Sequence, residues 1–376
     1  MGSVRRAGLV AALAAAPLGL AYRFALAYRV RAGYPRRYPL VSTPADLGLP
    51  YESLAVRSGE LELPAWFIPA RGIAPGPGVA LIHGWESARD RTLPHALFLH
   101  AAGFHCLTID VRGHGENPAE ALPLSAGEFG LDALAAFQAL IDRPEVSVGA
   151  ILGHSMGAIG AILAAAADDR VAALVAASAP ADPFRLTRQT FRLAHLPIPD
   201  PIAYPLAWLT TRVYLGPRGH DVADISAAVA IARYRGPILL VHGDQDSVVP
   251  VGHMDRLARA ARRGRSTEPP DAPVETLRLS GGQHSWLYED RRYRSTVARF
   301  LAQTLGGPLT ADEAASVAAE TPARRGAADD GRFTSVADTP GGFRTLAQVA
   351  LPRVTRLPAP VTDASMPALG DRPAAS

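Results

Sequence analysis

Three side chains of the kinds used in nucleophilic catalysis follow stretches that predict buried strands. Ser155 lies between an apolar run and a run of small residues. Asp246 comes soon after the apolar run 237–241, and His284 comes soon after the run 274–279. A serine hydroxyl attacks a carbonyl only when a base takes its proton and an acid orients that base. These three residue types therefore indicate acyl transfer.

The residues around Ser155 predict a sharp turn from a strand into a helix. The pattern is Gly-His-Ser-Met-Gly over 153–157, between the apolar run 148–152 and the small-residue run 158–167. Glycines at both ends of such a turn let the backbone bend, which leaves a strained and exposed serine at the tip. Such a turn places a nucleophile at the edge of a sheet.

Acyl transfer also requires hydrogen-bond donors for the oxyanion that develops when the serine attacks. We expect the backbone N–H of Met156, directly after the nucleophile, to be one donor. The second donor should come from the loop after the short apolar run 79–82, where the backbone N–H of Trp85 is the candidate. Gly84 permits the turn that aims it.

Two aspartates compete for the role of the acid. Asp244 and Asp246 both lie in the loop after the run 237–241, and the sequence alone leaves either available. With either one, the chain order is serine, acid, histidine, which differs from the trypsin-like and subtilisin-like orders.

Apolar runs alternate with helical patterns over most of the chain. This alternation predicts an α/β fold with a mostly parallel, doubly wound sheet of about eight strands, which begins with an antiparallel hairpin over 51–68. Parallel strands end at one edge of the sheet, so the candidate residues should meet there. The segment 181–236 breaks the alternation and predicts a helical cap insertion, whose aromatic residues suggest an apolar pocket.

The two ends of the chain differ from the folded domain predicted over 51–305. Residues 1–30 form a hydrophobic segment with three open interpretations: an uncleaved anchor, a cleaved export signal, or a helix that packs on the domain. We favour the anchor, with membrane association through residues 7–27, over a secreted or cytoplasmic protein. Residues 31–50 are a linker or wrapping segment, and 306–376 a disordered tail, because large apolar residues are few there.

Composition narrows the possible partners. The formal net charge is +3, every basic residue other than histidine is arginine, and no aromatic residues alternate with basic clusters. We therefore expect no nucleic-acid partner. The single cysteine, Cys106, excludes an intrachain disulfide and fits a buried strand. The histidines lack metal-ligand spacing, so we expect no metal site. The oligomeric state stays open.

The sequence resembles α/β-hydrolase fold proteins over about residues 50–305. It is similar in particular to the serine-aminopeptidase-like and prolyl-oligopeptidase-like bacterial hydrolases, some of which also begin with a hydrophobic segment and a proline-rich stretch. Five motifs carry the resemblance in the same order: His83-Gly84-Trp85, Asp-Val-Arg-Gly-His-Gly over 110–115, Gly-His-Ser-Met-Gly over 153–157, His-Gly-Asp-Gln-Asp-Ser-Val-Val-Pro over 242–250, and Gly-Gly-Gln-His over 281–284.

The resemblance implies a serine hydrolase that needs no cofactor and cleaves a small-molecule ester, or an amide or thioester. Ser155 would be the nucleophile, His284 the base and Asp246 the acid, because the family places the acid three residues after Gly243. It also implies that the 110–115 turn is architectural.

Three points qualify this reading. His83 is interpreted as a support for its loop, and His154 as a bystander. The chain departs from its relatives at Glu116 and Asn117, where a small polar residue is common, and the sequence does not say what this changes. Alternatives are a non-catalytic binding protein of the same fold, a peptidase or acyltransferase, or another chemistry such as perhydrolysis.

Overall fold

A computed structural model of the chain describes residues 2–72, 74–193, 196–263, 265 and 272–323. Within these residues an eight-stranded sheet runs in the order β1-β2-β4-β3-β5-β6-β7-β8. The first two strands pair antiparallel with each other, β2 pairs antiparallel with β4, and all other neighbours are parallel. The predicted fold class is confirmed. The strands are β1 (Glu52–Ser58), β2 (Leu61–Ile68), β3 (Gly76–Ile82), β4 (His105–Ile109), β5 (Val146–His154), β6 (Val171–Ala177), β7 (Ile238–Gly243) and β8 (Val274–Leu279).

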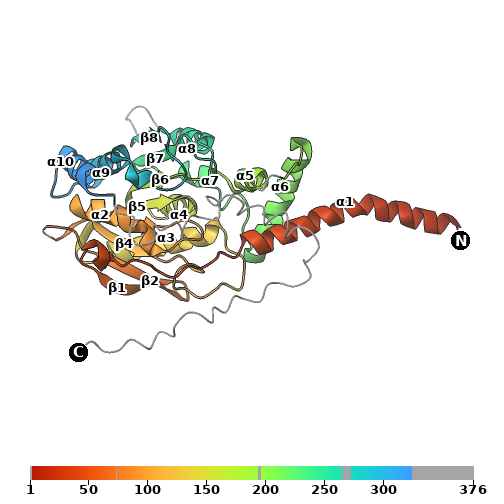
Figure 1. Ribbon diagram of the computed structural model, residues 1–376, viewed down its shortest axis with the longest axis horizontal. Coiled ribbons are helices and arrows are strands. Elements are labelled where there is room, and N and C mark those ends of the chain that lie inside the picture. Colours follow the sequence, from red (N-terminus) through yellow and green to blue (C-terminus); the bar gives the residue numbers. More distant parts are fainter. Residues whose placement is uncertain (1, 73, 194–195, 264, 266–271, 324–376) are drawn as a thin grey trace.

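Helices cover both faces of the sheet (Figure 1). Successive side chains of a strand point to opposite faces, so Ile151 packs on one side and Ala150 and Leu152 on the other. Strands buried in this way read as continuous apolar runs. The helices are α2 (Leu93–Ala101), α9 (Arg291–Leu305) and α10 (Ala311–Glu320) on the Leu152 side, and α3 (Ala126–Ile141), α4 (Met156–Ala165), α7 (Ala227–Ile231) and α8 (Gly252–Arg262) on the Ile151 side.

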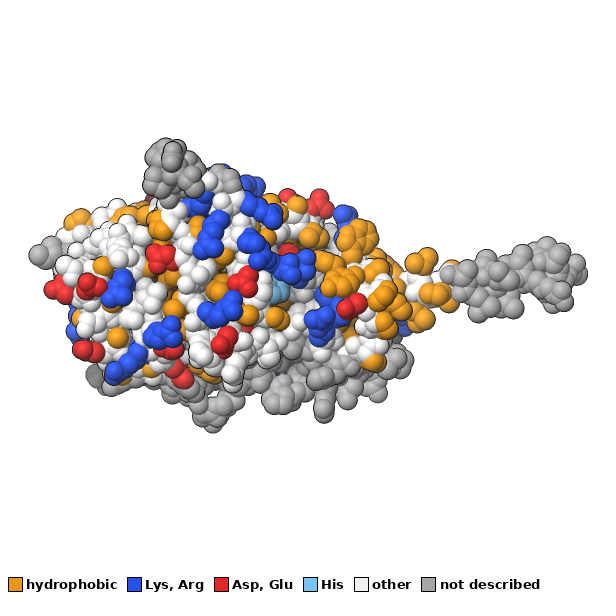
Figure 2. Space-filling model, turned by 90° about the horizontal axis from the view of Figure 1, so that it is seen from above, with side chains coloured by type: hydrophobic (Ala, Val, Ile, Leu, Met, Phe, Trp, Pro, Cys, Tyr) orange, Lys and Arg blue, Asp and Glu red, His pale blue; other side chains and the backbone are white. Residues whose placement is uncertain are grey.

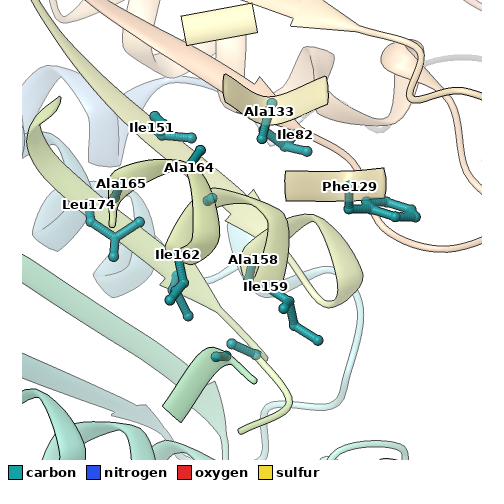
Figure 3. Close-up of a cluster of buried hydrophobic side chains, with 14 of the residues drawn as sticks. Ile82, Phe129, Ala133, Ile151, Ala158, Ile159, Ile162, Ala164, Ala165 and Leu174 are labelled. Carbon is teal, nitrogen blue, oxygen red and sulfur yellow. The ribbon is translucent and has the colours of Figure 1, made fainter. Parts of the chain in front are cut away.

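The packing of α4 fixes the nucleophile turn in place. Ala158, Ile159 and Ile162 of α4 lie beside Phe129 of α3 and Ile151 of the sheet, all buried (Figure 3). The start of α3 is held by a capping box, in which Ser125 and Glu128 bond reciprocally. A loss of such a cap typically costs about 1 kcal/mol.

Residues 181–236 contain α5 (Pro183–Leu193), α6 (Asp200–Leu215) and α7. The first two helices pack with the end of the N-terminal helix α1 (Gly2–Ala32) around a small core of their own. Tyr28, Phe191 and Ala207 are buried there, with Phe24 and Tyr214 against them. We call this unit of α5, α6 and residues 24–32 of α1 the cap.

The N-terminal helix packs on the folded domain through its end. The end of α1 lies against α6, and Ala25, Ala27 and Tyr28 are buried. No helix among the residues that the structure describes is long and apolar enough to cross a membrane. Thr190 donates to the Tyr28 hydroxyl at 3.2 Å, and Tyr214 donates to the carbonyl of Ala32 at 3.2 Å.

The segment after α1 wraps across the loops that follow β3. The backbone N–H of Arg36 donates to Glu86 at 3.2 Å, and that of Val41 donates to Asp90 at 3.1 Å. Arg31, near the end of α1, lies 3.9 Å from the Glu86 carboxylate. The N-terminal segment thus contacts the loop that carries Trp85.

The predicted tail begins too early. Helix α10, at Ala311–Glu320, lies within the 306–376 segment that composition marks as disordered. Small residues suffice for its packing, because Ala314, Ala315 and Ala318 are buried and Arg294 of α9 donates to the Ala318 carbonyl at 3.0 Å. Residues 324–376 lie outside the described part of the chain.

Candidate active site

Ser155 stands at the turn between β5 and α4, as the sequence predicts. Its backbone has φ 56° and ψ −118°, a left-handed conformation that is strained for a serine. Its N–H donates to the carbonyl of Ala177 at the end of β6, at 2.9 Å. A side chain at Gly153 would collide with the backbone of Gly157, and one at Gly157 would collide with the end of β3. The two glycines therefore allow the bend.

His284 and Asp246 lie in a row with the serine. His284 Nε2 is 3.0 Å from Ser155 Oγ, and His284 Nδ1 is 2.8 Å from Asp246 Oδ2. The side chains of His284 and Asp246 are buried. An ionised carboxylate only accepts hydrogen bonds, so Nδ1 carries the proton and Nε2 is left to accept the serine proton. The structure brings together all three side chains that the sequence singles out.

The surroundings of Asp246 keep it ionised. Burial acts to raise the pKa of Asp246, but hydrogen bonds from His242 and His284 outweigh it and hold this pKa far below its usual range. His242 Nε2 lies 3.2 Å from Asp246 Oδ2, and the other carboxylate oxygen accepts from the N–H of Val249 at 2.7 Å. The sequence shows His242 only as a motif residue, so its contact with the acid was missed.

Asp244 has a different position. Its carboxylate accepts from the N–H of Gly281 at 2.7 Å, which ties the loop after β7 to the loop that carries His284. Asp246, and not Asp244, is the aspartate that contacts the histidine ring.

His154 is not a bystander. Its Nε2 lies 2.7 Å from the backbone carbonyl of His284, to which it donates. The hydroxyl of Ser178 also donates to this carbonyl, at 3.4 Å. The residue beside Ser155 therefore holds the backbone of His284. The sequence carries no local signal for this contact, because the two residues lie 130 positions apart.

The two predicted oxyanion donors lie on segments that meet at the turn. Met156 is the first residue of α4, and the first N–H groups of a helix have no partner within it. Trp85 follows Gly84, where an added side chain would come within 3.3 Å of the His154 carbonyl. The loop after β3 thus passes close to the serine.

His83 braces this loop. Its Nδ1 donates to the carbonyl of Gly84 at 2.7 Å, and its Nε2 accepts from the N–H of Val111 at 3.0 Å. Burial lowers the pKa of His83 to about 4, so the ring is neutral near pH 7. A neutral ring can make both bonds, which fits a supporting role.

The turn after β4 forms a buried polar network. Arg89 pairs with both Asp110 and Glu116, and Asp110 accepts from the N–H of Arg89 at 2.7 Å. Asn117 donates to the carbonyl of Asp110 at 2.8 Å. Glu116 and Asn117, which depart from the resemblance, thus complete this network. Neither side chain hydrogen-bonds to Ser155, His284 or Asp246.

A cavity of about 260 Å³ contains Ser155 and His284. On one side its walls come from the cap, with Tyr28 of α1, Thr187 of α5 and Tyr214 of α6. On the other side they come from α2 and the region after His284, with His95 and Tyr288.

Of the aromatic residues of 181–236 that were expected to form the pocket, Tyr214 lines the cavity. Phe184 and Phe191 lie in the core of the cap, and Tyr204 and Trp208 are exposed. Tyr28 was missed, because the sequence places it in a segment expected to be an anchor or a signal.

Among the described residues no group of three or more His, Cys, Asp or Glu side chains is placed to hold a metal ion. Cys106 is buried, and burial raises the pKa of its thiol. This thiol has the surroundings of a core residue.

Comparisons with known proteins agree with the fold. The chain is 28% identical over 276 residues to the Alpha/beta hydrolase domain-containing protein WAV2 of Arabidopsis thaliana, which covers 68% of this chain and 81% of that protein. The esterase Pf2001 of Pyrococcus furiosus has a TM-score of 0.57 at 21% identity, covering 73% of this chain and 97% of the esterase. The acylaminoacyl peptidase of Pyrococcus horikoshii has a TM-score of 0.50 at 16% identity, covering 69% and 42% of the two chains.

The model of the Alpha/beta hydrolase family matches residues 79–299, which is more than half of the chain. The matched region begins in β3 and ends in α9, and so includes Ser155, Asp246 and His284. The fold, with esterases and peptidases among its structural neighbours, supports a hydrolase. The chain belongs to the alpha/beta hydrolase family.

Proposed function

We propose that this protein is a serine hydrolase that cleaves a carboxylic ester through an acyl-enzyme on Ser155. The observation that carries the proposal is the row from Asp246 through His284 to Ser155, with separations of 2.8 and 3.0 Å, beside a cavity. The order of protons in this row suits the removal of the serine proton by His284 Nε2.

In the proposed reaction, Ser155 Oγ bonds to the carbonyl carbon of the ester as its proton moves to His284 Nε2. The N–H groups of Trp85 and Met156 stabilise the oxyanion. The C–O bond to the alcohol then breaks, and His284 gives the proton to the leaving oxygen. A water molecule attacks the acyl-enzyme with His284 again as base, which releases the acid and restores the serine.

Asp246 orients the imidazole and stabilises its charged form during both steps. His154 supports the same geometry from the backbone side, through the His284 carbonyl. A displacement of a catalytic group by about 1 Å can cost on the order of a hundredfold in rate, so this contact is part of the proposed machinery.

The test is hydrolysis of a panel of soluble acyl esters by purified full-length protein, from short to long acyl chains, with amides of the same acyl groups alongside. We expect Ser155→Ala to abolish turnover and labelling by a fluorophosphonate probe. Ser53→Ala, an exposed serine on β1, is the matched control and should behave as wild type.

Three results would overturn the proposal. Ester hydrolysis that persists in Ser155→Ala would exclude Ser155 as the nucleophile. An absence of both turnover and probe adduct in the wild type would favour a binding protein of the same fold. Faster cleavage of the amides than of the esters would make the protein a peptidase or amidase that uses the same residues.

A further inference from the structure

We propose that the outer face of α6, together with the exposed part of α1 beside it, binds the surface of a lipid bilayer that contains anionic lipids. This inference concerns an interaction surface and does not depend on the chemistry at Ser155. We call the surface the cap face and define it by its exposed large apolar side chains: Leu18, Leu20, Tyr22, Ile202, Tyr204 and Trp208.

Helix α6 is apolar on both sides. Its inner side is buried at Ala203, Ala207 and Thr211, against α1 and α5. On its outer side Ile202 is 60% exposed and Trp208 is 53% exposed. A helix that is apolar all round is normally buried on all sides. Because its outer side is exposed, α6 lacks a partner there among the described residues.

Helix α1 extends this apolar surface beyond the domain. Leu18 is 73% exposed and Leu20 is 68% exposed, in a part of the helix that projects away from the body (Figure 1). Apolar side chains gather over the base of this projection (Figure 2). Tyr28 of α1 packs edge-on against Tyr214 of α6, with ring centroids 6.0 Å apart, which holds the two helices together.

The charges on these helices have one sign. In the described part of the cap, α5 and α6 contain a single acidic residue, Asp200, which pairs with Arg188. The guanidinium of Arg212 lies 4.8 Å from the Trp208 ring, and Arg23 is exposed on α1. Aromatic and basic side chains together are typical of surfaces that lie at the headgroup level of a bilayer. Each arginine near an anionic surface adds to the attraction between the protein and the bilayer.

This charge pattern favours lipid over a second copy of the chain. A two-fold dimer through the cap face would bring identical patches together and so place arginines opposite arginines. Anionic headgroups would instead neutralise them. Because no described helix can cross a membrane, the proposed mode is attachment along the surface.

The cap face also has a functional consequence. The helices that carry it supply one wall of the cavity beside Ser155. Bound to a bilayer, the protein would hold that cavity close to the acyl esters of lipids. This consequence rests on the proposed function, whereas the binding itself does not.

The experiment is flotation of full-length protein with vesicles of phosphatidylcholine alone, and with vesicles of phosphatidylcholine and phosphatidylglycerol. We expect the wild type to float with the anionic vesicles and to lose this binding as salt is raised. The double variant Ile202→Ser, Trp208→Ser should reduce binding by at least about tenfold, since it removes apolar contact area. Arg23→Gln with Arg212→Gln should weaken binding to anionic vesicles only.

The matched control is Leu131→Ser with Val229→Ser. These side chains are 53% and 46% exposed, on α3 and α7 away from the cap face, and their loss should leave flotation unchanged. Hydrolysis of a short soluble ester should be equal in all these variants, because none of the changed residues lines the cavity. If the wild type does not hydrolyse the short ester, that result would count against the proposed function and not against lipid binding.

Three outcomes would overturn the proposal. The first is a wild type that does not bind anionic vesicles. The second is equal binding by the Ile202 and Trp208 variant and the wild type. The third is a wild-type dimer in sedimentation that becomes a monomer in this variant. The last result would make a second copy the occupant of the cap face.

Discussion

The edge of the sheet and the cap both contribute to the cavity, but they are held in different ways. At the edge, Ser155, Asp246 and His284 follow strand ends, and backbone groups of neighbouring strands and loops fix them. In the cap, three helices from distant parts of the sequence pack through a few buried side chains, including Tyr28 and Phe191. Backbone hydrogen bonds therefore hold the residues at the edge, whereas a small hydrophobic core holds the cap together.

This difference suggests a division of labour. Substitutions at the edge should act on the chemical step and so on kcat, because they move reacting groups. Substitutions in the cap should act on KM and on the preference for acyl chains, because they change the wall of the cavity. The cap should also open at a lower free energy than the sheet, since it buries fewer apolar contacts.

The largest expected effect separates the two aspartates. Asp246→Asn should lower kcat by about 10³- to 10⁴-fold, because a neutral amide no longer stabilises the charged imidazole and can select the wrong tautomer. Asp244→Asn should lower kcat far less, since its partner is the N–H of Gly281. Steady-state kinetics on one soluble ester compare them directly, and similar losses in both would contradict the assignment.

A smaller effect is expected at His154. Removing its bond to the His284 carbonyl in His154→Ala should lower kcat by about tenfold to a hundredfold, through misplacement of the base. His154→Gln keeps a side-chain donor and should restore part of the rate. KM should change little in either variant. An unchanged kcat in His154→Ala would show that the carbonyl contact has no influence on the base.

In the cap, Phe191→Ala removes a buried ring from a small core. A loss of this kind typically costs about 3–5 kcal/mol, so we expect the cap to loosen and KM for long acyl esters to rise, with kcat for short esters retained. Thermal unfolding and kinetics on both ester classes are the measurements. Equal losses on short and long esters would mean that the cap and the edge are not separable.

The smallest effect concerns how the cap is attached. His220, which follows α6, lies 2.7 Å from Glu128 of α3. The hydrogen bond to Glu128 raises the pKa of His220. The charged His220 therefore stabilises the folded protein fully below the ordinary histidine pKa, and this stabilisation is lost as pH rises through the raised value. Burial acts to raise the pKa of Glu128, but the hydrogen bonds from His220 and Ser125 outweigh burial, so this pKa is lowered. The contribution of Glu128 to stability is lost as pH falls through the lowered value.

The stability difference between wild type and His220→Gln should therefore be greatest on the acid side of neutrality and shrink above it. Melting temperatures across this pH range test the point, with His100→Gln, whose ring lies at the carbonyl of Pro69, as a comparison. A constant difference across the range would show that the charge of His220 does not matter.

The sequence predicts the edge well for physical reasons. Buried parallel strands appear as apolar runs, and the bend at Ser155 requires glycines at fixed positions, so residues 153–157 carry the signal locally. The position of His284 follows from a strand end, whereas the choice of Asp246 over Asp244 needed the family resemblance. The partnership of His154 with the His284 carbonyl could not be predicted, because it depends on the ring orientation of one residue and on a backbone 130 residues away.

The cap is the opposite case. Residues 7–27 indicate a hydrophobic segment, but nothing local says that Tyr28 packs on Phe191 and lines the cavity. Helix α10 was missed because alanines signal no core until a partner such as α9 is in place. Pairings between distant segments are decided by side-chain shape, which periodicity does not encode.

The place of α1 at the start of the chain has a consequence for synthesis. Its end bonds to residues that are made much later, since the Tyr214 hydroxyl that donates to Ala32 lies 182 residues further along. Domains form largely as the chain emerges from the ribosome, so this helix must wait for its partners. During that interval its apolar side chains have only solvent, chaperones or a membrane to contact. The wall of the cavity is therefore among the last parts of the protein to be assembled, although it uses residues that are made before most of the domain.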